Sequence, residues 1–316
     1  MAAKETNRRM TGNVLLTITS LVWGLAFVAQ RVGMDSIGPV TFTAVRMILA
    51  AAAVGLVAFL QERAGRKHSP PMTREENERR RKDTIVGGIC CGVFLTAASI
   101  FQQIGLVYTT AGKAGFITAM YILLVPVLNF LLFRKKNPAF VWAAVGIGVV
   151  GMYLLCINES FTLTKGDVLE CICALFFSCQ ILSCDRFTGK GNPLTISAIQ
   201  FLTTAVLAGI AAFIMEEPAW VQIEAAMVPI LYCGLVSAGL GYTLQMIGQR
   251  YTDPTVASLL MSMESVFALV AGAVILHERL STRELLGCLV MFIAIMLSQI
   301  SPELLHNIGK NIKNRA

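Results

Sequence analysis

The sequence has few charged residues. Only 14% of its 316 residues are Asp, Glu, Lys or Arg, whereas 55% are hydrophobic, and the mean hydropathy is +0.67. A soluble domain of this size carries about a quarter charged residues. The apolar residues fall into stretches of roughly twenty, which is the length that spans the hydrocarbon core of a bilayer. The composition therefore excludes an ordinary soluble domain and indicates an integral membrane protein.

Ten apolar stretches account for most of the chain, and no segment large enough for a separate soluble domain lies between them. They cover residues 13–32, 39–60, 84–107, 114–133, 138–156, 167–185, 193–214, 226–248, 254–276 and 284–301. Basic residues precede the first stretch, as in a signal peptide, but its apolar run is long and lacks a small-x-small cleavage site. We expect it to be retained, so the sequence predicts an all-α integral membrane fold of ten transmembrane helices.

Histidine is scarce, and the motifs of common catalytic sites are missing. The three histidines, His68, His277 and His306, lie in predicted loops or in the C-terminal tail. The apolar stretches contain no Ser–His pair, no H-E-x-x-H motif and no phosphate-binding loop. We therefore expect neither an enzyme nor a cofactor. The chain also has no nucleotide-binding domain, so we do not expect it to drive transport with ATP on its own.

The nine cysteines do not have the spacing of a metal site. None forms the C-x-x-C pair that is typical of structural zinc sites. Eight lie within apolar stretches, and Cys156 ends one. We interpret them as thiols embedded in the membrane and expect no metal.

The net charge of +7 is distributed in the manner of a membrane protein and does not indicate a nucleic-acid partner. If the N-terminus is cytoplasmic and ten helices alternate, then 20 of the 26 Lys and Arg residues face the cytoplasm, five face the outside and Arg46 lies inside a helix. This bias follows the positive-inside rule. We expect a multi-pass protein of the cell membrane, with a charged cytoplasmic loop at 61–83 and cytoplasmic tails at 1–11 and 302–316.

The two halves of the sequence resemble each other, which indicates an internal repeat. A shift of 154 aligns residues 12–55 with 166–209, and the identical positions include Gly12, Val14, Leu15, Ile18, Leu21, Pro39, Thr41, Ala44, Ala51 and Gly55. Further along, a shift of 143 aligns QQIGLVYT (102–109) with QMIGQRYT (245–252). The shift changes because the first half has the longer charged loop.

Each repeat contains five predicted helices, the first repeat within residues 12–156 and the second within 166–301. Because five is odd, the second copy enters the membrane from the opposite side, and the two copies form an inverted repeat. Many transporters are built in this way and bind their substrate at mid-membrane between the halves. Each half can adopt the conformation of the other, so the site opens to one side and then to the other. Pro126 lies deep in the fourth helix, and we expect it to kink that helix.

Two ionisable side chains lie clearly inside apolar stretches, where an unpaired polar group is costly. Glu264 is in the middle of LLMSMESVFALV (259–270). It fits three roles: a proton carrier, a ligand for a cationic or amine substrate, or a structural residue bonded to hydroxyls or to Arg46. Arg46 lies about 10 Å into the second helix at 1.5 Å per residue. Its counterpart is Gln200, which favours a packing role for Arg46 over a charge-specific one.

The repeat alignment brings more polar and aromatic positions together: Glu264 with Tyr121, Gln102 with Gln245, and Trp23 with Phe177. We expect a central cavity lined by aromatic and amide side chains with one carboxylate, which would suit a small amphipathic metabolite. The candidate substrate-binding residues are Glu264, Tyr121, Trp23, Arg46, Gln102, Gln245, Tyr242 and Gln180. Asp167 and Glu170, at the predicted outer end of the sixth helix, are interpreted as solvated acids favoured by the helix dipole.

Three segments occur in order along the two repeats: LVWGLAFVAQRVG (21–33), FITAMYILLVPVLNFLLFRKK (116–136) and SLLMSMESVFALVAGAVILHERLSTRELLGCLVMFIAIML (258–297). They resemble the opening motif, the fourth helix with its basic turn, and the ninth and tenth helices of EamA-type permeases in the drug/metabolite transporter superfamily. The resemblance covers residues 12–300. Two departures are Ser265, where the family often has proline, and Glu278, which has no acidic counterpart in the first repeat.

The resemblance implies ten helices in two inverted EamA-like repeats that move small metabolites, amino acids among them, by alternating access. The inverted repeat and the buried polar groups predict a secondary transporter of a small organic metabolite, for which an amino acid or a related amphipath is the candidate. The protein would lie in the lipid bilayer, and a proton is the candidate coupling ion. The alternative is a non-transporting membrane partner or a lipid-carrier translocase subunit, which a dry interface between the halves would favour. We assign no transport direction and no oligomeric state.

Overall fold

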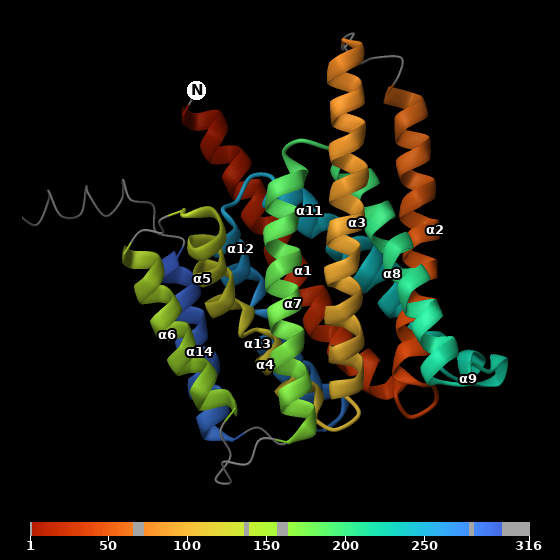
Figure 1. The fold of residues 1–316 in the computed structure, drawn as a ribbon. Helices are drawn as coiled ribbons and strands as arrows, with labels where there is room; N and C mark the ends of the chain where they lie inside the picture. Colours follow the sequence, from red (N-terminus) through yellow and green to blue (C-terminus); the bar gives the residue numbers. More distant parts are fainter. Residues whose placement is uncertain (1, 66–72, 136–138, 157–163, 278–280, 299–316) are drawn as a thin grey trace, which may run out of the picture.

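The computed structural model describes residues 2–65, 73–135, 139–156, 164–277 and 281–298, which form helices and no strands (Figure 1). The helices are α1 (Ala2–Gly33), α2 (Pro39–Gly65), α3 (Arg74–Gly105), α4 (Ala111–Thr118), α5 (Tyr121–Phe133), α6 (Ala139–Cys156), α7 (Lys165–Thr188), α8 (Pro193–Met215), α9 (Trp220–Ala225), α10 (Met227–Leu231), the π-helix η1 (Tyr232–Tyr242), α11 (Thr243–Gln249), α12 (Pro254–Met261), α13 (Glu264–Ile275) and α14 (Thr282–Ser298). The predicted all-α fold is confirmed over this part of the chain. The tail 302–316, residues 66–72 of the charged loop, and Glu278 lie outside it.

Eight helical runs in the described ranges are long and apolar enough to cross a bilayer. They are Asn7–Gly33, Pro39–Arg63, Arg74–Gly105, Ala111–Phe133, Lys165–Thr188, Pro193–Met215, Met227–Gln249 and Pro254–Ile275. Helices α6 and α14 occupy the fifth and tenth predicted stretches with shorter apolar cores, and they pack together on one flank of the bundle (Figure 1). Eight of the ten predicted crossings are thus supported by length and composition, and the other two stay predictions.

Three helices continue beyond the predicted apolar stretches. Helix α1 reaches into the predicted tail 1–11, and α2 and α3 reach into the predicted loop 61–83. Helix α3 begins there because Thr73 and Glu76 form a capping box, in which each side chain binds the other residue's backbone N–H. Hydropathy marks the part of a helix that lies in the membrane and does not mark its end. The loop at 61–83 is therefore shorter than predicted.

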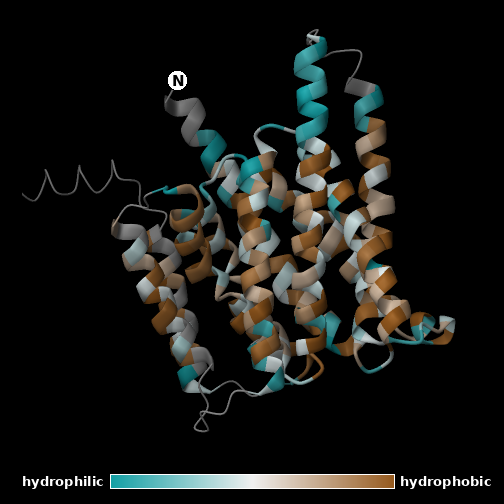
Figure 2. Cartoon of the chain, viewed as in Figure 1, coloured by the Kyte–Doolittle hydropathy of each residue, from teal (hydrophilic) through white to brown (hydrophobic). Residues whose placement is uncertain are grey.

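Many large apolar side chains are exposed on the outside of the bundle, and hydrophobic residues predominate along the middle of the helices (Figure 2). Phe213, Ile214 and Val228 are among the most exposed, at 80%, 78% and 78%. Such a surface is unfavourable in water and fits a hydrocarbon environment. The hydrophilic ends of α2 and α3 gather with the N-terminus at one end of the bundle, which we call the near end (Figures 1 and 2). Helices α4 and α7 begin at the opposite end, which we call the far end.

The contacts between helices repeat with the two-fold relation that the alignment predicts. Helix α2 packs against its counterpart α8, and α1 packs against η1 and α11 as α7 packs against α3. A Cβ atom at Gly12 would lie 2.9 Å from the carbonyl oxygen of Gly248, and one at Gly166 would lie 3.0 Å from that of Gly105. The alignment relates these two pairs, so the same close backbone approach occurs once in each repeat. Glycine permits this approach because it has no Cβ atom.

The fourth and ninth membrane helices are interrupted at aligned positions. Helices α4 and α5 are separated at residues 119–120, and α12 and α13 at 262–263. Backbone i→i+3 bonds tighten the chain at both places. Pro126 lies inside α5, which continues on both sides of it, and the kink expected there stays a prediction. The aligned residue in α13 is Leu269, so proline is not the shared cause of the two interruptions.

We expect Gly24→Ala to destabilise the bundle where α1 meets α13. A Cβ atom at Gly24 would lie 2.3 Å from Phe267 Cβ and 2.8 Å from the carbonyl oxygen of Glu264, and such overpacking costs about 1–3 kcal/mol. At Gly209 on α8 nothing lies within 4 Å of the added atom, and alanine is the better helix former by about 1 kcal/mol. The thermal unfolding midpoint in detergent should fall for Gly24→Ala and stay level or rise for Gly209→Ala. Equal midpoints for the two variants would contradict the packing described.

Candidate functional site

One cavity lies in the middle of the bundle, and all eight candidate substrate-binding residues line it. Its wall consists of Trp23, Ala26, Phe27, Gln30, Arg46, Gln102, Thr118, Tyr121, Phe177, Gln180, Ile181, Ser237, Tyr242, Gln245 and Glu264. Each of these residues is at most 8% exposed. The space open to the centre of a water molecule is about 20 Å³, little more than the roughly 10–15 Å³ that one ordered water needs. The structure is therefore a closed conformation, in which a metabolite would need a wider cavity.

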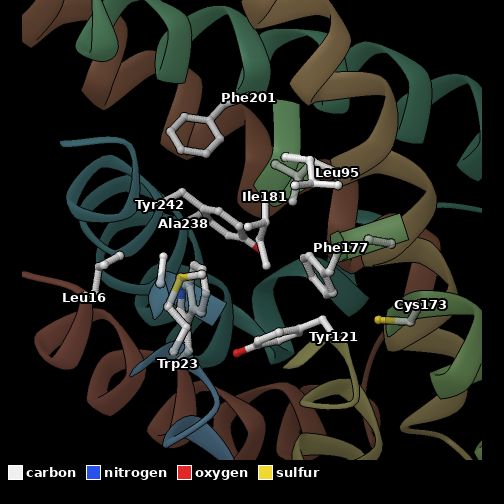
Figure 3. Packing of buried hydrophobic residues seen from close by; sticks show 14 of the residues in the cluster. Leu16, Trp23, Leu95, Tyr121, Cys173, Phe177, Ile181, Phe201, Ala238 and Tyr242 are labelled. Atoms are coloured by element: carbon white, nitrogen blue, oxygen red, sulfur yellow. The ribbon is translucent and has the colours of Figure 1, made fainter. Parts of the chain in front are cut away.

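Aromatic rings form one side of the cavity (Figure 3). The rings of Trp23 and Tyr242 are 4.6 Å apart, and Phe201 meets Tyr242 edge-on at 6.1 Å. Trp23 Nε1 donates a hydrogen bond of 3.1 Å to the carbonyl oxygen of Ser237. Ser237 lies in the π-helix η1, a winding that occurs frequently at functional sites. The indole is therefore held in a fixed orientation by the backbone of the opposite repeat.

Arg46 carries a buried positive charge, and no acid in the described part of the chain lies within ion-pair distance of it. The side chain is 3% exposed, and Nη1 donates a 2.8 Å hydrogen bond to Gln30 Oε1, a neutral partner. Its guanidinium lies 5.7 Å from the centre of the Phe42 ring, while Nε has no hydrogen-bond partner. A planar guanidinium with free donors is the group that best binds a carboxylate through two parallel hydrogen bonds. The packing role expected from the alignment accounts for the bond to Gln30 and leaves Nε unexplained.

Glu264 carries a buried carboxyl group whose Oε1 has no hydrogen-bond partner. It is the first residue of α13, directly after the interruption, and its counterpart Tyr121 is the first residue of α5. The two side chains interact electrostatically, although Tyr121 Oη has no partner at hydrogen-bonding distance. Arg46 and Glu264 form no ion pair, so that version of the structural role is wrong. The roles as proton carrier and as ligand for an amine both remain compatible with the geometry.

Three glutamines form a hydrogen-bonded cluster at another part of the wall. Gln180 Nε2 donates to Gln245 Oε1 at 3.3 Å, and Gln245 Nε2 donates back to Gln180 Oε1 at 3.1 Å. Gln180 Nε2 also donates to Gln200 Oε1 at 3.0 Å. This cluster joins α7, α8 and α11 and leaves Gln200 Nε2 without a partner. The amides therefore fix the shape of the wall, since a buried amide is stable only where its bonds are made.

The interpretation of Asp167 and Glu170 as solvated acids is wrong. Glu170 is 0% exposed and Asp167 is 2% exposed. Asp167 does cap the first turn of α7, but it also forms a 2.8 Å ion pair with Lys113 at the start of α4. Glu170 accepts a 2.9 Å hydrogen bond from Thr118 of the cavity wall. The acids are buried because α4 and the end of α3 cover this end of α7, a long-range contact that a helix-end pattern does not reveal.

Four residues in or beside the cavity were not predicted from the sequence: Gln30, Thr118, Ser237 and Glu170. Glu170 shares a stripe on α7 with Phe177 and Gln180, at spacings of seven and three residues, which is the spacing of one helix face. That periodicity could have placed Glu170 on the inner face. Ser237 contributes its carbonyl oxygen, so nothing in its side chain could have signalled the contact.

The EamA-like transporter family matches residues 10–157 and again residues 164–299. An uncharacterized transporter of Archaeoglobus fulgidus is 27% identical over 294 residues, covering 92% of this chain and 86% of the relative. The threonine/homoserine exporter RhtA of Escherichia coli K12 is 28% identical over 180 residues, covering 55% of this chain and 59% of that protein. A solved crystal structure shares the fold at a TM-score of 0.72 and 18% identity, covering 92% of this chain and 96% of its own.

The matches agree with the architecture described above. The family model fits the chain twice, once in each half, and the membrane-crossing helices and central polar cavity are those of a protein that carries molecules through a bilayer. The resemblance noted in the sequence is confirmed. The chain belongs to the EamA-like transporter family and is a multi-pass membrane transport protein.

Proposed function

We propose that the protein is a secondary transporter of a small zwitterionic metabolite, an amino acid or a close relative, and that it works by alternating access in the cell membrane with both termini in the cytoplasm. The observation that carries this proposal is a guanidinium and a carboxyl group, those of Arg46 and Glu264, which line one closed cavity without pairing with each other. A zwitterion would supply a partner for both.

The unused atoms of the cavity wall match the two ends of an amino acid. Arg46 Nε would bind a carboxylate together with the nearby Nη donors, and Glu264 Oε1 would accept from an ammonium group. The faces of Trp23 and Tyr242 would cover the apolar part or the cation. Buried charges without partners are costly, so a binding role explains why both charges are kept in the same cavity.

Closure at both ends supports alternating access. At the near end Thr252 Oγ1 donates a 3.0 Å hydrogen bond to Asn13 Oδ1. At the far end Lys113 pairs with Asp167 at 2.8 Å. The aligned interruptions in the fourth and ninth helices give each repeat a place to bend. Opening one end at a time would expose the cavity alternately, as in other inverted-repeat transporters.

The curated relatives support the substrate class. RhtA is named as an exporter of threonine and homoserine, both of which are small zwitterions, and it matches over 55% of this chain. The alternative, a non-transporting partner or a translocase subunit for a lipid carrier, called for a dry and fully packed interface between the repeats. A polar cavity with unpaired buried charges favours transport instead.

We expect Arg46→Gln and Glu264→Gln to remove recognition of opposite ends of the substrate. Removing one partner of a buried charge pair costs about 2–5 kcal/mol, which is more than a tenfold loss of affinity because each 1.4 kcal/mol is about tenfold. The measurement is competition for labelled amino-acid transport in proteoliposomes, with matched amines and carboxylic acids as competitors. Arg46→Gln should lose inhibition by the acids, and Glu264→Gln should lose inhibition by the amines.

The matched controls are Arg79→Gln and Glu75→Gln, which make the same chemical changes in the exposed first turns of α3. Both should behave like the unmodified protein. If no zwitterion in a broad panel is transported, or if both cavity variants keep their full discrimination, the proposed binding mode is wrong.

We expect a covalent link at the near end to stop transport. Asn13 and Thr252 are in direct contact through their side chains, and a disulfide needs Cα atoms about 4.4–6.8 Å apart. The double variant Asn13→Cys/Thr252→Cys should lose at least nine-tenths of its transport on oxidation and regain it on reduction. Each single variant should be indifferent to oxidation, which controls for the native cysteines. Unimpaired transport by the fully cross-linked protein would exclude alternating access through this end.

A further inference from the structure

A second group of buried polar side chains leads from the cavity to the far end, and the binding mode does not use it. Gln102 Nε2 donates to Thr118 Oγ1 at 3.3 Å, and Thr118 Oγ1 donates to Glu170 Oε2 at 2.9 Å. Glu170 is 0% exposed, and its Oε1 has no partner. One turn nearer the far end, Asp167 pairs with Lys113, which is partly exposed. The group therefore spans from the cavity wall to a charged pair near the membrane surface.

Comparison of the two repeats shows that packing alone does not require a carboxyl group at position 170. A Cβ atom at Gly105 would lie 2.7 Å from Glu170 Oε1, and a Cβ atom at the aligned Gly248 would lie 2.9 Å from Leu16 Cγ. Leu16 is the residue that aligns with Glu170, and it is also 0% exposed. The same site against a glycine is thus filled by leucine at the near end and by glutamate at the far end.

The neighbouring contacts differ in the same way. Thr118, which binds Glu170, aligns with Met261, which is apolar and fully buried. Asp167 aligns with Asn13, so the far end is closed by an ion pair where the near end is closed by a hydrogen bond between neutral groups. At these aligned positions, the far end therefore carries ionisable side chains where the near end carries neutral ones.

None of the titratable and charged groups described around Glu170 provides a cation that would pair with its ionised form. They are Asp167 and Cys173 of α7, Glu264 of α13, Lys113 of α4, and Tyr108 and Lys165 at the far end. Lys113 is bonded to Asp167, and Lys165 lies over the Tyr108 ring. No basic group in the described ranges lies within ion-pair distance of Glu170. Glu264 lies close enough to repel a negative charge on Glu170.

We propose that Glu170 is a proton-binding site that controls the far-end closure of the transporter. With its proton, the carboxyl group stays packed between α3, α4 and α7. When the proton leaves the carboxyl oxygen for water at the far end, the resulting anion is better hydrated than buried, and the far end opens. Closure returns a proton from water to the same oxygen. This control of the far-end closure rests on the proposed alternating access and not on the identity of the substrate.

The arrangement also couples the proton to the substrate. A substrate ammonium bound at Glu264 offsets the repulsion between Glu264 and Glu170 and so favours release of the Glu170 proton. Substrate in the cavity and a proton on Glu170 therefore oppose each other, which is the relation that exchange of one for the other requires.

The test uses Cys173 of the full-length protein as a reporter of far-end opening and needs no substrate. Cys173 is 0% exposed, and its Sγ lies 4.0 Å from Thr118 Oγ1, inside the polar group. Cys171 on the same helix is exposed and corrects for the intrinsic rise of thiol alkylation with pH. The ratio of Cys173 to Cys171 alkylation by N-ethylmaleimide should rise several-fold with pH in the unmodified protein.

Glu170→Gln fixes the neutral form, so its labelling ratio should stay low at every pH. Glu170→Asp keeps a titratable group and should keep the rise. Thr118→Val removes the donor that stabilises the anion and should move the midpoint of the labelling curve to higher pH. Glu78→Gln, at an exposed position in the first turns of α3, is the matched control and should label like the unmodified protein. Infrared difference spectra should show the carboxylic-acid C=O band of the unmodified protein, and Glu170→Gln should lose it.

A labelling ratio that is independent of pH in the unmodified protein, or a rise that persists in Glu170→Gln, would overturn the inference. If Glu170→Gln does not fold, the Thr118→Val midpoint decides, because a purely structural hydroxyl would leave it unchanged. Failure of these tests with amino-acid transport intact rejects the Glu170 site alone. Normal labelling behaviour without any transported amino acid rejects the proposed substrate instead.

Discussion

The hydrocarbon interior of a bilayer offers no hydrogen bonds, so every polar group that crosses it must find its partner inside the protein. Helices meet this requirement for the backbone along their length. The polar side chains that remain turn inward, and several of them meet at the central cavity. Most of them are satisfied, as in the reciprocal bonds of Gln180 and Gln245. Among those with an atom that has no partner, Arg46, Glu264 and Tyr121 border the same closed space.

The two repeats meet this constraint with the same helix arrangement. Close helix contacts recur at the glycine pairs 12–248 and 166–105, and the two interruptions recur at 119–120 and 262–263. Function then depends on the places where the copies differ. Arg46 aligns with a glutamine of the other repeat, and Glu264 aligns with a tyrosine. A symmetric framework is what the proposed alternating access requires, and an asymmetric lining suits the proposed zwitterionic substrate, whose two ends differ.

The general architecture and much of the cavity could be predicted because both follow from periodic features of the sequence. Apolar stretches locate the membrane helices, and the alignment of the halves picked out Tyr121 from Glu264 and Gln245 from Gln102. The ends of α1, α2 and α3 could not be located by hydropathy, because charged helical turns outside the membrane resemble loops in composition. Glu170 was misplaced because its burial depends on α4, which is distant in sequence. Asp167 caps α7 as its pattern indicates, yet capping does not distinguish an exposed end from a covered one.

The π-helix η1 has no counterpart in the first repeat, where the aligned residues belong to the regular helix α3. Each residue of an α-helix advances the chain by about 1.5 Å and turns it by about 100°. A change of winding in η1 by one residue would therefore rotate and slide the neighbouring helix by that amount without separating it from its neighbours. Ser237, which binds the Trp23 indole, and Tyr242, whose ring packs at a tilt against it, both lie in this segment. A change of winding in this segment would therefore re-aim the aromatic wall of the cavity.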